Sequence, residues 1–180
     1  MRNKNPWRFV DFIIIAMIGS MGLAVKAVIG PLAQMLSAAL FIPGGTLSGG
    51  IYMMFLVIPA GLVKKPGAST LTALFQAVLV MILGTYGTHG AASLITYTLP
   101  GLAVDIVCLL LRNSCETMPC CVLAGMAANF MGCVGSNLLF FKLISLPFLL
   151  MAVGACLSGG LGGLASHGIC RRIEKMDILR

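Results

Sequence analysis

The sequence predicts an all-α integral membrane protein: a single domain over residues 1–180, folded as a bundle of six transmembrane helices with both ends on the cytoplasmic side. Composition is the first reason. Only 9% of the residues are charged, 59% are hydrophobic and the mean hydropathy is +1.03, whereas soluble domains carry roughly 25% charged residues. The second reason is that most Lys and Arg residues stand between long apolar segments. We therefore expect a multi-pass protein of a cell membrane, specifically a bacterial plasma membrane.

Six apolar segments are long enough to cross a hydrocarbon layer of roughly 30 Å at a rise of 1.5 Å per residue. They lie at about residues 9–29, 47–63, 68–84, 90–111, 119–141 and 145–169, which leaves short cytoplasmic tails at 1–8 and 170–180. A seventh apolar piece, residues 32–42, stands between Gly30-Pro31 and Pro43-Gly44-Gly45. It is too short to cross and is predicted to form an outer half-helix between the first two spans.

The positions of Lys and Arg test this count, because cytoplasmic loops carry an excess of both. With the N-terminus inside, the inner segments hold ten of the twelve: three in the N-terminal tail, two at Lys64-Lys65, one at Arg112 and four in the C-terminal tail. Lys26 and Lys142 remain near the outer side. Counting residues 32–42 as a seventh span would move the Lys64-Lys65 pair outside, so the rule favours six. The scattered charges also form no continuous basic face for nucleic acid.

The sequence predicts no enzyme activity, cofactor or metal site. It contains neither a G-x-x-x-x-G-K-[ST] phosphate loop nor an H-E-x-x-H zinc motif. The seven cysteines do not predict a disulfide framework. Three of them fall inside apolar segments, where a cysteine acts as a small hydrophobe: Cys108, Cys133 and Cys156. The other four lie near the reducing cytoplasmic face: Cys115, Cys120, Cys121 and Cys170.

Polar side chains gather in the outer half of the predicted bundle. Polar groups are costly in lipid and normally face the bundle interior or a water-filled cavity. Because these groups favour one side of the membrane, they predict a pocket that opens outward rather than a through-pore. Amides, hydroxyls and aromatic rings suit a small, flat, largely neutral ligand. The candidate ligand-binding residues are Gln34, Gln76, Tyr86, His89, Thr96, Tyr97, Asn129 and Asn137.

Several of these residues also have a structural interpretation. Asn129 and Asn137 are equally explained by hydrogen bonds between helices. Tyr86 and Tyr97 are equally explained by a position at the membrane interface. Asp105 lies on the inner half of the fourth span, away from the predicted pocket, and we expect it to pair with a polar neighbour or a nearby cation rather than to couple protons.

Small residues recur at helical spacing on two predicted helices. In the last span they recur at every fourth position from Gly154 to Ser166, which predicts close packing against neighbouring helices. In the first span, one smooth face is formed by Ala16, Ser20 and Ala24. By itself this second pattern serves equally for packing inside the bundle and for docking of a separate protein.

Two further features point to a known family. Lys64-Lys65-Pro66-Gly67-Ala68 is followed by a long apolar helix that ends at Leu83-Gly84, and a short chain holds six spans with an outer half-helix after the first. Together with the smooth face of the first span, this layout resembles the substrate-binding membrane subunits (S components) of energy-coupling factor (ECF) transporters, over about residues 8–172. The turn resembles the basic-Pro-Gly-Ala turn of the branch associated with thiamine and hydroxymethylpyrimidine.

The resemblance implies a subunit that captures a vitamin or vitamin precursor from outside and delivers it inward. A separate transmembrane coupling subunit and two ATPase subunits would supply the energy. By position, Ala16, Ser20 and Ala24 would form the coupling face, and residues 32–42 would gate the pocket. The third span carries Gln76, whereas that branch often has an acidic residue there. A cationic ligand such as thiamine would lack a counter-ion, which favours a neutral pyrimidine or another vitamin.

Two other classes of function stay open. A self-contained channel or facilitator would need a polar path to the inner face, where polar residues are sparse apart from Asp105, Ser166 and His167. A membrane scaffold would use the small-residue faces for assembly alone. It would leave the outer polar residues without a shared ligand.

Overall fold

The computed structural model describes residues 6–38, 45–84, 92–141 and 146–176. Every regular element in these ranges is helical: α1 (Phe9–Ala38), α2 (Gly45–Val63), α3 (Ala68–Leu83), α4 (Ala92–Leu110), α5 (Met118–Ser136) and α6 (Leu146–Lys175). A short π-helical segment, η1 (Asn137–Phe141), extends α5. A helix therefore stands at each of the six predicted positions, and the all-α prediction is confirmed for the described residues.

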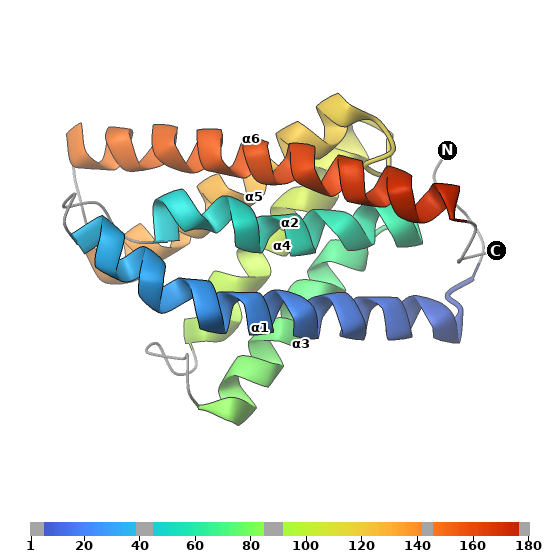
Figure 1. The fold of residues 1–180 in the computed structure, drawn as a ribbon, viewed down its shortest axis with the longest axis horizontal. Helices are drawn as coiled ribbons and strands as arrows, with labels where there is room; N and C mark the ends of the chain where they lie inside the picture. Colours follow the sequence, from blue (N-terminus) through green and yellow to red (C-terminus); the bar gives the residue numbers. More distant parts are fainter. Residues whose placement is uncertain (1–5, 39–44, 85–91, 142–145, 177–180) are drawn as a thin grey trace.

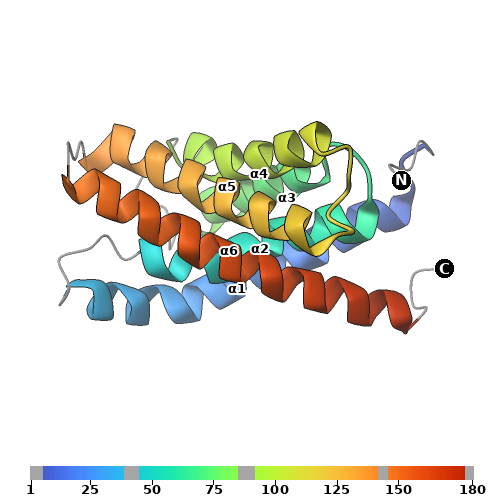
Figure 2. The ribbon, with the colours of Figure 1, turned by 90° about the horizontal axis from the view of Figure 1, so that it is seen from above.

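The helices form one elongated bundle with α2 at its centre. α2 contacts α1, α3, α4, α5 and α6, and Figure 1 shows it between α1 and α6. α1 begins and α6 ends at the same end of the bundle (Figures 1 and 2). We call this the terminal end. The count of six membrane spans and the cytoplasmic position of both ends remain predictions.

α1 departs from the predicted layout. The sequence predicted a first span over residues 9–29 and a separate half-helix over 32–42, but α1 continues through Gly30 and Pro31 to Ala38. Proline inside a helix removes one hydrogen bond and often kinks or ends the helix, but helices in a membrane tolerate it where neighbouring groups satisfy the freed backbone. Pro31 lies inside α1 and does not end it. Residues 32–38 are therefore the last turns of α1, and residues 39–42 lie outside the described residues.

The last two spans also end differently from the prediction. α6 continues past residue 169 to Lys175, so most of the predicted C-terminal tail is helical. Arg172 and Lys175 stand in its last turn, where positive charges interact favourably with the helix dipole. The segment predicted as one span over 119–141 changes at Asn137 from α-helix to η1.

Glycine permits the closest helix crossings. Gly162 of α6 faces the backbone of Gly50 in α2, and Gly159 of α6 faces Gly125 in α5, so a Cβ at these α6 positions would overlap backbone atoms. The Gly50 amide donates a hydrogen bond of 3.0 Å to Ser158 Oγ. The predicted close packing of the small residues in the last span is confirmed.

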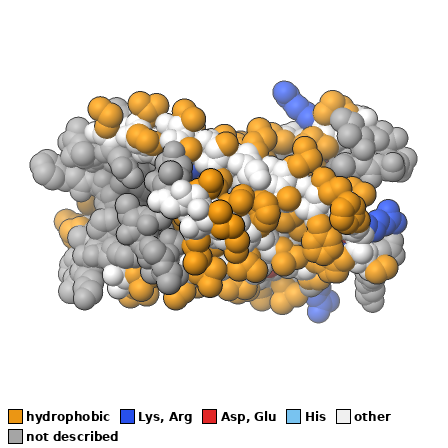
Figure 3. Space-filling model, turned by 90° about the horizontal axis from the view of Figure 1, so that it is seen from below, with side chains coloured by type: hydrophobic (Ala, Val, Ile, Leu, Met, Phe, Trp, Pro, Cys, Tyr) orange, Lys and Arg blue, Asp and Glu red, His pale blue; other side chains and the backbone are white. Residues whose placement is uncertain are grey.

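The surface of the bundle is apolar. Phe9, Ile82 and Leu110 are 80%, 74% and 75% exposed. Figure 3 shows hydrophobic side chains across the middle of one face, with Lys and Arg toward the terminal end. Among the described residues, α1, α6 and α5 with its extension contain stretches long and apolar enough to cross a membrane, and the apolar stretches of α2, α3 and α4 are shorter. A surface of this kind is stable in lipid rather than in water, so the protein belongs in a membrane.

Candidate functional site

Three polar side chains from three helices meet in the half of the bundle away from the terminal end. Lys26 Nζ of α1 donates a hydrogen bond to Tyr97 Oη of α4 at 2.5 Å and lies 4.0 Å from the centre of the Tyr97 ring. The centre of the Tyr52 ring of α2 is 5.7 Å from the same nitrogen. An ammonium group near aromatic rings is stabilised by cation–π attraction. We call Lys26, Tyr52 and Tyr97 the outer polar cluster.

Tyr52 contributes an unused polar atom to this cluster. Its Oη is buried and has no hydrogen-bond partner among the described residues, although buried phenol groups normally have one. Gly30 of α1 stands opposite, where a Cβ would come within 4.0 Å of Tyr52 Oη. The sequence analysis did not select Tyr52. The available signal was a tyrosine in the predicted outer half of a largely apolar span.

Gln76 of α3 lies further along α1 toward the terminal end. Its Nε2 donates a hydrogen bond to the carbonyl oxygen of Gly19 at 3.2 Å, and the side chain is buried. Gly22 of α1 leaves the space that the amide fills, because a Cβ there would lie 2.7 Å from Gln76 Nε2. Gln76 therefore joins α1 to α3 at Gly19, about two helical turns from Lys26. Its position is compatible with both a structural and a ligand-binding role.

The remaining described candidates are distributed over other interfaces. Asn129 of α5 is buried and donates a hydrogen bond to Ala155 O of α6 at 2.9 Å, so it joins two helices as the structural interpretation expected. Asn137 is buried at the start of η1. Thr96 precedes Tyr97 on α4 and is half-buried. Tyr86 and His89 lie outside the described residues, as does the side chain of Gln34 on α1.

At the terminal end, the turn between α2 and α3 is built around Lys65. This lysine is buried and forms an ion pair with Asp11 of α1. Its Nζ also donates a hydrogen bond to Pro6 O at 2.7 Å and lies 5.5 Å from the centre of the Trp7 ring. Gly67, with φ of 86°, supplies the left-handed conformation that the turn requires. The turn thereby fixes the beginning of α1 against the α2–α3 connection.

Lys64, the first residue of the same turn, points to other partners. Its Nζ lies 2.6 Å from Glu174 Oε1 of α6 and 3.5 Å from Glu116 Oε1 of the loop before α5. Partial burial alone would lower the pKa of Lys64, but the hydrogen bond to Glu174 and the charges of Glu116 and Glu174 raise it above its ordinary value. Through these two lysines, the α2–α3 turn contacts the beginning of α1, the loop before α5 and the end of α6.

Comparison with known proteins places the chain in a family. Residues 10–131, more than half of the chain, match the family described as "ABC-type cobalt transport system, permease component". The chain belongs to this family. Among solved structures it is similar to a "Crystal structure of an S-component of ECF transporter", with a TM-score of 0.82 and 22% sequence identity over 97% of this chain and 89% of that chain. No curated protein matches it.

The permease family and the S-component fold agree with the resemblance predicted from the sequence. Both are transport proteins of the membrane and neither is a class of enzyme. The thiamine and hydroxymethylpyrimidine branch remains a prediction.

In this permease-family fold, the small-residue face of α1 lies outside the packed core. Ser20 and Ala24 are exposed and Ala16 is half-buried, while the neighbouring Met17 and Met21 are 68% and 61% exposed. The buried side of the same helix carries other residues: Ile15, Gly19, Gly22 and Leu23. Among the described residues, the face of Ala16, Ser20 and Ala24 is therefore available to lipid or to a separate protein rather than used in packing the bundle.

Proposed function

We propose that this permease-family protein is the substrate-capture subunit of an ECF-type importer in a bacterial plasma membrane. It binds a vitamin or vitamin precursor from outside and delivers it inward when docked to a coupling subunit and two ATPase subunits. The observation that carries the proposal is the S-component fold, which extends over 97% of the chain. The absence of a phosphate loop from the sequence supports the assignment of ATP hydrolysis to other subunits.

The outer polar cluster favours an organic ligand over the cobalt ion that the family description names. Imidazole, thiolate and carboxylate groups are the protein ligands that first-row transition metals generally use. The cluster instead presents the ammonium group of Lys26, which repels a cation, together with two phenols. An aromatic ligand would stack on a tyrosine ring and hydrogen-bond to Tyr52 Oη, the buried hydroxyl without a partner among the described residues.

The charge of Lys26 also separates the two ligands of the favoured branch. Thiamine carries a permanent positive charge, and neither Lys26 nor the neutral Gln76 offers it a counter-ion. A neutral hydroxymethylpyrimidine-like ring avoids this repulsion and presents ring nitrogens to Lys26 and the phenols. We therefore infer a neutral, hydroxymethylpyrimidine-like ligand. Alongside the cluster, the candidate contacts are Gln34, Gln76, Tyr86, His89, Thr96, Asn129 and Asn137.

The first experiment is mass spectrometry of the purified, detergent-solubilised protein for a small molecule carried through purification, followed by thermal shift with a panel of vitamins, precursors and Co²⁺. A stoichiometric pyrimidine, or a shift with hydroxymethylpyrimidine that exceeds the shift with thiamine, supports the proposal. The opposite outcome is a protein that carries no small molecule and whose melting temperature does not change with any vitamin or precursor. If liposomes that contain this chain alone also conduct solutes, the protein is a channel.

A further inference from the structure

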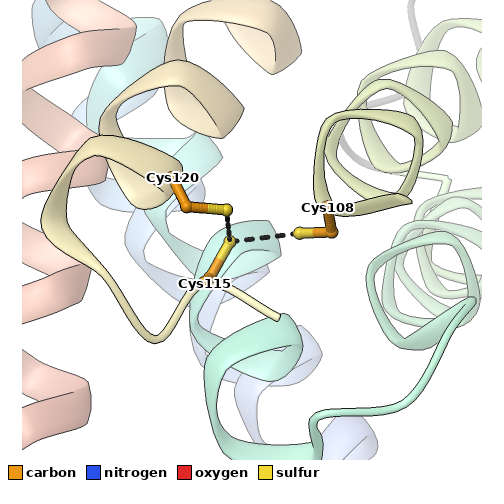
Figure 4. A group of neighbouring side chains, drawn as sticks. All are labelled: Cys108, Cys115 and Cys120. Atoms are coloured by element: carbon orange, nitrogen blue, oxygen red, sulfur yellow. Dashed lines mark hydrogen bonds between the residues drawn. The ribbon is translucent and has the colours of Figure 1, made fainter. Parts of the chain in front are cut away.

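Three cysteines from consecutive segments meet at the terminal end, beside the α2–α3 turn. Cys108 lies near the end of α4, Cys115 in the connecting loop and Cys120 in the first turn of α5. Cys115 Sγ lies 3.3 Å from Cys108 Sγ and 3.9 Å from Cys120 Sγ. All three sulfur atoms lie within 4.8 Å of one another, and Figure 4 shows the three side chains pointing toward a common centre. We call them the thiol cluster.

The backbone of the loop is held in an unusual conformation that brings Cys115 into this cluster. Cys115 has φ of 54° and Arg112 has φ of 49°, in the left-handed region that residues other than glycine seldom occupy. The Asn113 side chain holds the loop in this conformation. Its Oδ1 accepts a hydrogen bond from Glu116 N at 3.0 Å, and its Nδ2 donates one to Thr117 Oγ1 at 3.1 Å. Backbone strain of this kind persists where the surrounding structure enforces it, and functional sites are enriched in it.

The spacing of the sulfur atoms corresponds to a metal–thiolate site. Zinc binds thiolates at about 2.3 Å in a tetrahedral arrangement, so two sulfurs on one zinc ion lie roughly 3.8 Å apart. The two distances from Cys115 Sγ, 3.3 and 3.9 Å, fall near this value. Cys115 and Cys120 are only 1% and 2% exposed, whereas Cys108 is half-buried, so two of the three sulfur atoms are shielded from solvent. Thiolates select soft or borderline ions, zinc among them.

We propose that Cys108, Cys115 and Cys120 form a Zn²⁺ site that fastens α4, the following loop and α5 together. As each S–Zn bond forms, the thiol releases its proton to solvent. The partial positive charge at the N-terminus of α5 favours the thiolate of Cys120. Beside Cys108 lies a cleft of about 10 Å³, which has room for about one water. A water there would supply the fourth ligand. The cleft is lined by Ala60, Lys65, Pro66, Asp105, Cys108, Leu109 and Ser114.

This site is separate from the capture of the transported ligand, since the thiol cluster and the outer polar cluster lie in opposite halves of the bundle. The sequence analysis predicted no metal site. The spacing C-x₆-C-x₄-C matches no familiar zinc pattern, and the three positions meet only because the loop folds back between the two helix ends.

The test uses Co²⁺ as a spectroscopic substitute for Zn²⁺ in the full-length, reduced, chelator-treated protein in detergent. One equivalent of Co²⁺ should give a sulfur-to-cobalt charge-transfer band, and Zn²⁺ should displace it because Zn²⁺ is bound more tightly. The C108S, C115S and C120S variants should each lose most of the band. C133S and C156S, which change cysteines outside the cluster, should keep it.

A second measurement applies even if a cluster variant fails to fold. In the wild-type protein, Zn²⁺ should slow alkylation of Cys108, the half-buried member of the cluster, as mapped by peptide mass spectrometry, and should raise the melting temperature. Any of three results would overturn the proposal. The charge-transfer band is absent at one equivalent of Co²⁺, or it persists in all three cluster variants, or Zn²⁺ does not slow the alkylation. Formation of a Cys108–Cys115 disulfide without metal uptake would replace it with a redox role.

Discussion

Asp105 of α4 accepts two hydrogen bonds from Thr70 at the beginning of α3. The Thr70 backbone amide lies 2.8 Å and its Oγ1 2.5 Å from Asp105 Oδ2. The N-cap of α3 is Gly67, which has no side chain to accept the free N–H groups of the first turn. A carboxylate from a neighbouring helix therefore performs the capping role. The predicted pairing of Asp105 with a polar neighbour is confirmed.

The D105A variant should be destabilised by about 1–3 kcal/mol, because it leaves the Thr70 donors without an acceptor in a partly buried position. D105N should lose less, since an amide oxygen still accepts a hydrogen bond. Unfolding in mixed detergent micelles, followed by circular dichroism, measures both. If D105N keeps its stability but abolishes uptake by the reconstituted transporter, Asp105 couples protons instead.

The G162A variant should destabilise the bundle by about 1–3 kcal/mol, because its new methyl group would overlap the Gly50 backbone and force α2 and α6 apart. The matched control is G168A on the same helix, where a Cβ meets no atom within 4 Å. There the substitution should be neutral or stabilising by up to about 1 kcal/mol, since alanine favours helix more than glycine does. Equal melting temperatures for the two variants would contradict the close crossing.

Much of this fold could be predicted from sequence because lipid imposes simple rules on length and charge. Apolar length located the six helices, and the positions of Lys64, Lys65 and Arg112 predicted which loops share a side. The continuation of α1 to Ala38 could not be predicted. Gly30-Pro31 is a breaking signal in isolation, and whether it breaks a helix depends on neighbouring helices that the local sequence does not specify.

The candidate sites were less predictable because they depend on contacts between distant segments. Tyr97 was selected as a candidate ligand contact, whereas Lys26 was placed near the outer side and not selected, and the contact between the two residues was not predicted. Tyr52 and the thiol cluster were missed, since each acquires its chemistry from neighbours on other segments. Gln76 was selected as a ligand contact, which remains a prediction, and the sequence did not indicate that the carbonyl oxygen of Gly19 would accept its hydrogen bond.

Removal of the Lys64 charge in K64M should lower stability by up to about 1 kcal/mol at neutral pH, the range of partly exposed ion pairs. The pKa of Lys64 is raised in the folded state. The Lys64 charge therefore makes its full contribution to the free energy of unfolding below the ordinary lysine pKa. It disappears as pH rises through the higher folded value. The difference in unfolding free energy between wild type and K64M should therefore be constant from neutral pH to about 10 and should fall toward zero at higher pH.

The S20W variant should prevent assembly with the coupling subunit while ligand binding remains unchanged. The reason is that Ser20 is exposed at the middle of the Ala16–Ala24 face and a large ring would hold a partner helix away. L157W on α6, whose parent residue is 67% exposed, controls for a bulky ring on the lipid-facing surface and should assemble normally. Co-purification with the tagged coupling subunit measures assembly. Loss of ligand binding by S20W with assembly retained would reverse the assignment.

Substitution of the two tyrosines in the outer polar cluster should separate ligand binding from folding. Y52F removes a buried hydroxyl that has no partner among the described residues, so the ligand-free protein should be as stable as wild type or slightly more stable. If the hydroxyl contacts the ligand, affinity should fall about tenfold, equivalent to about 1.4 kcal/mol. Y97F should reduce both stability and affinity, because it deprives Lys26 of its hydrogen-bond acceptor.

The control for these two variants is T98V, whose parent hydroxyl bonds to Leu94 O within its own helix and should not affect binding. Thermal shift of the ligand-free protein and calorimetric titration with hydroxymethylpyrimidine provide the two measurements. A Y52F protein that is less stable but binds with unchanged affinity would show that the hydroxyl has a structural partner. It would then not belong to the ligand site, and Lys26 and Tyr97 alone would remain as the candidate contacts of the cluster.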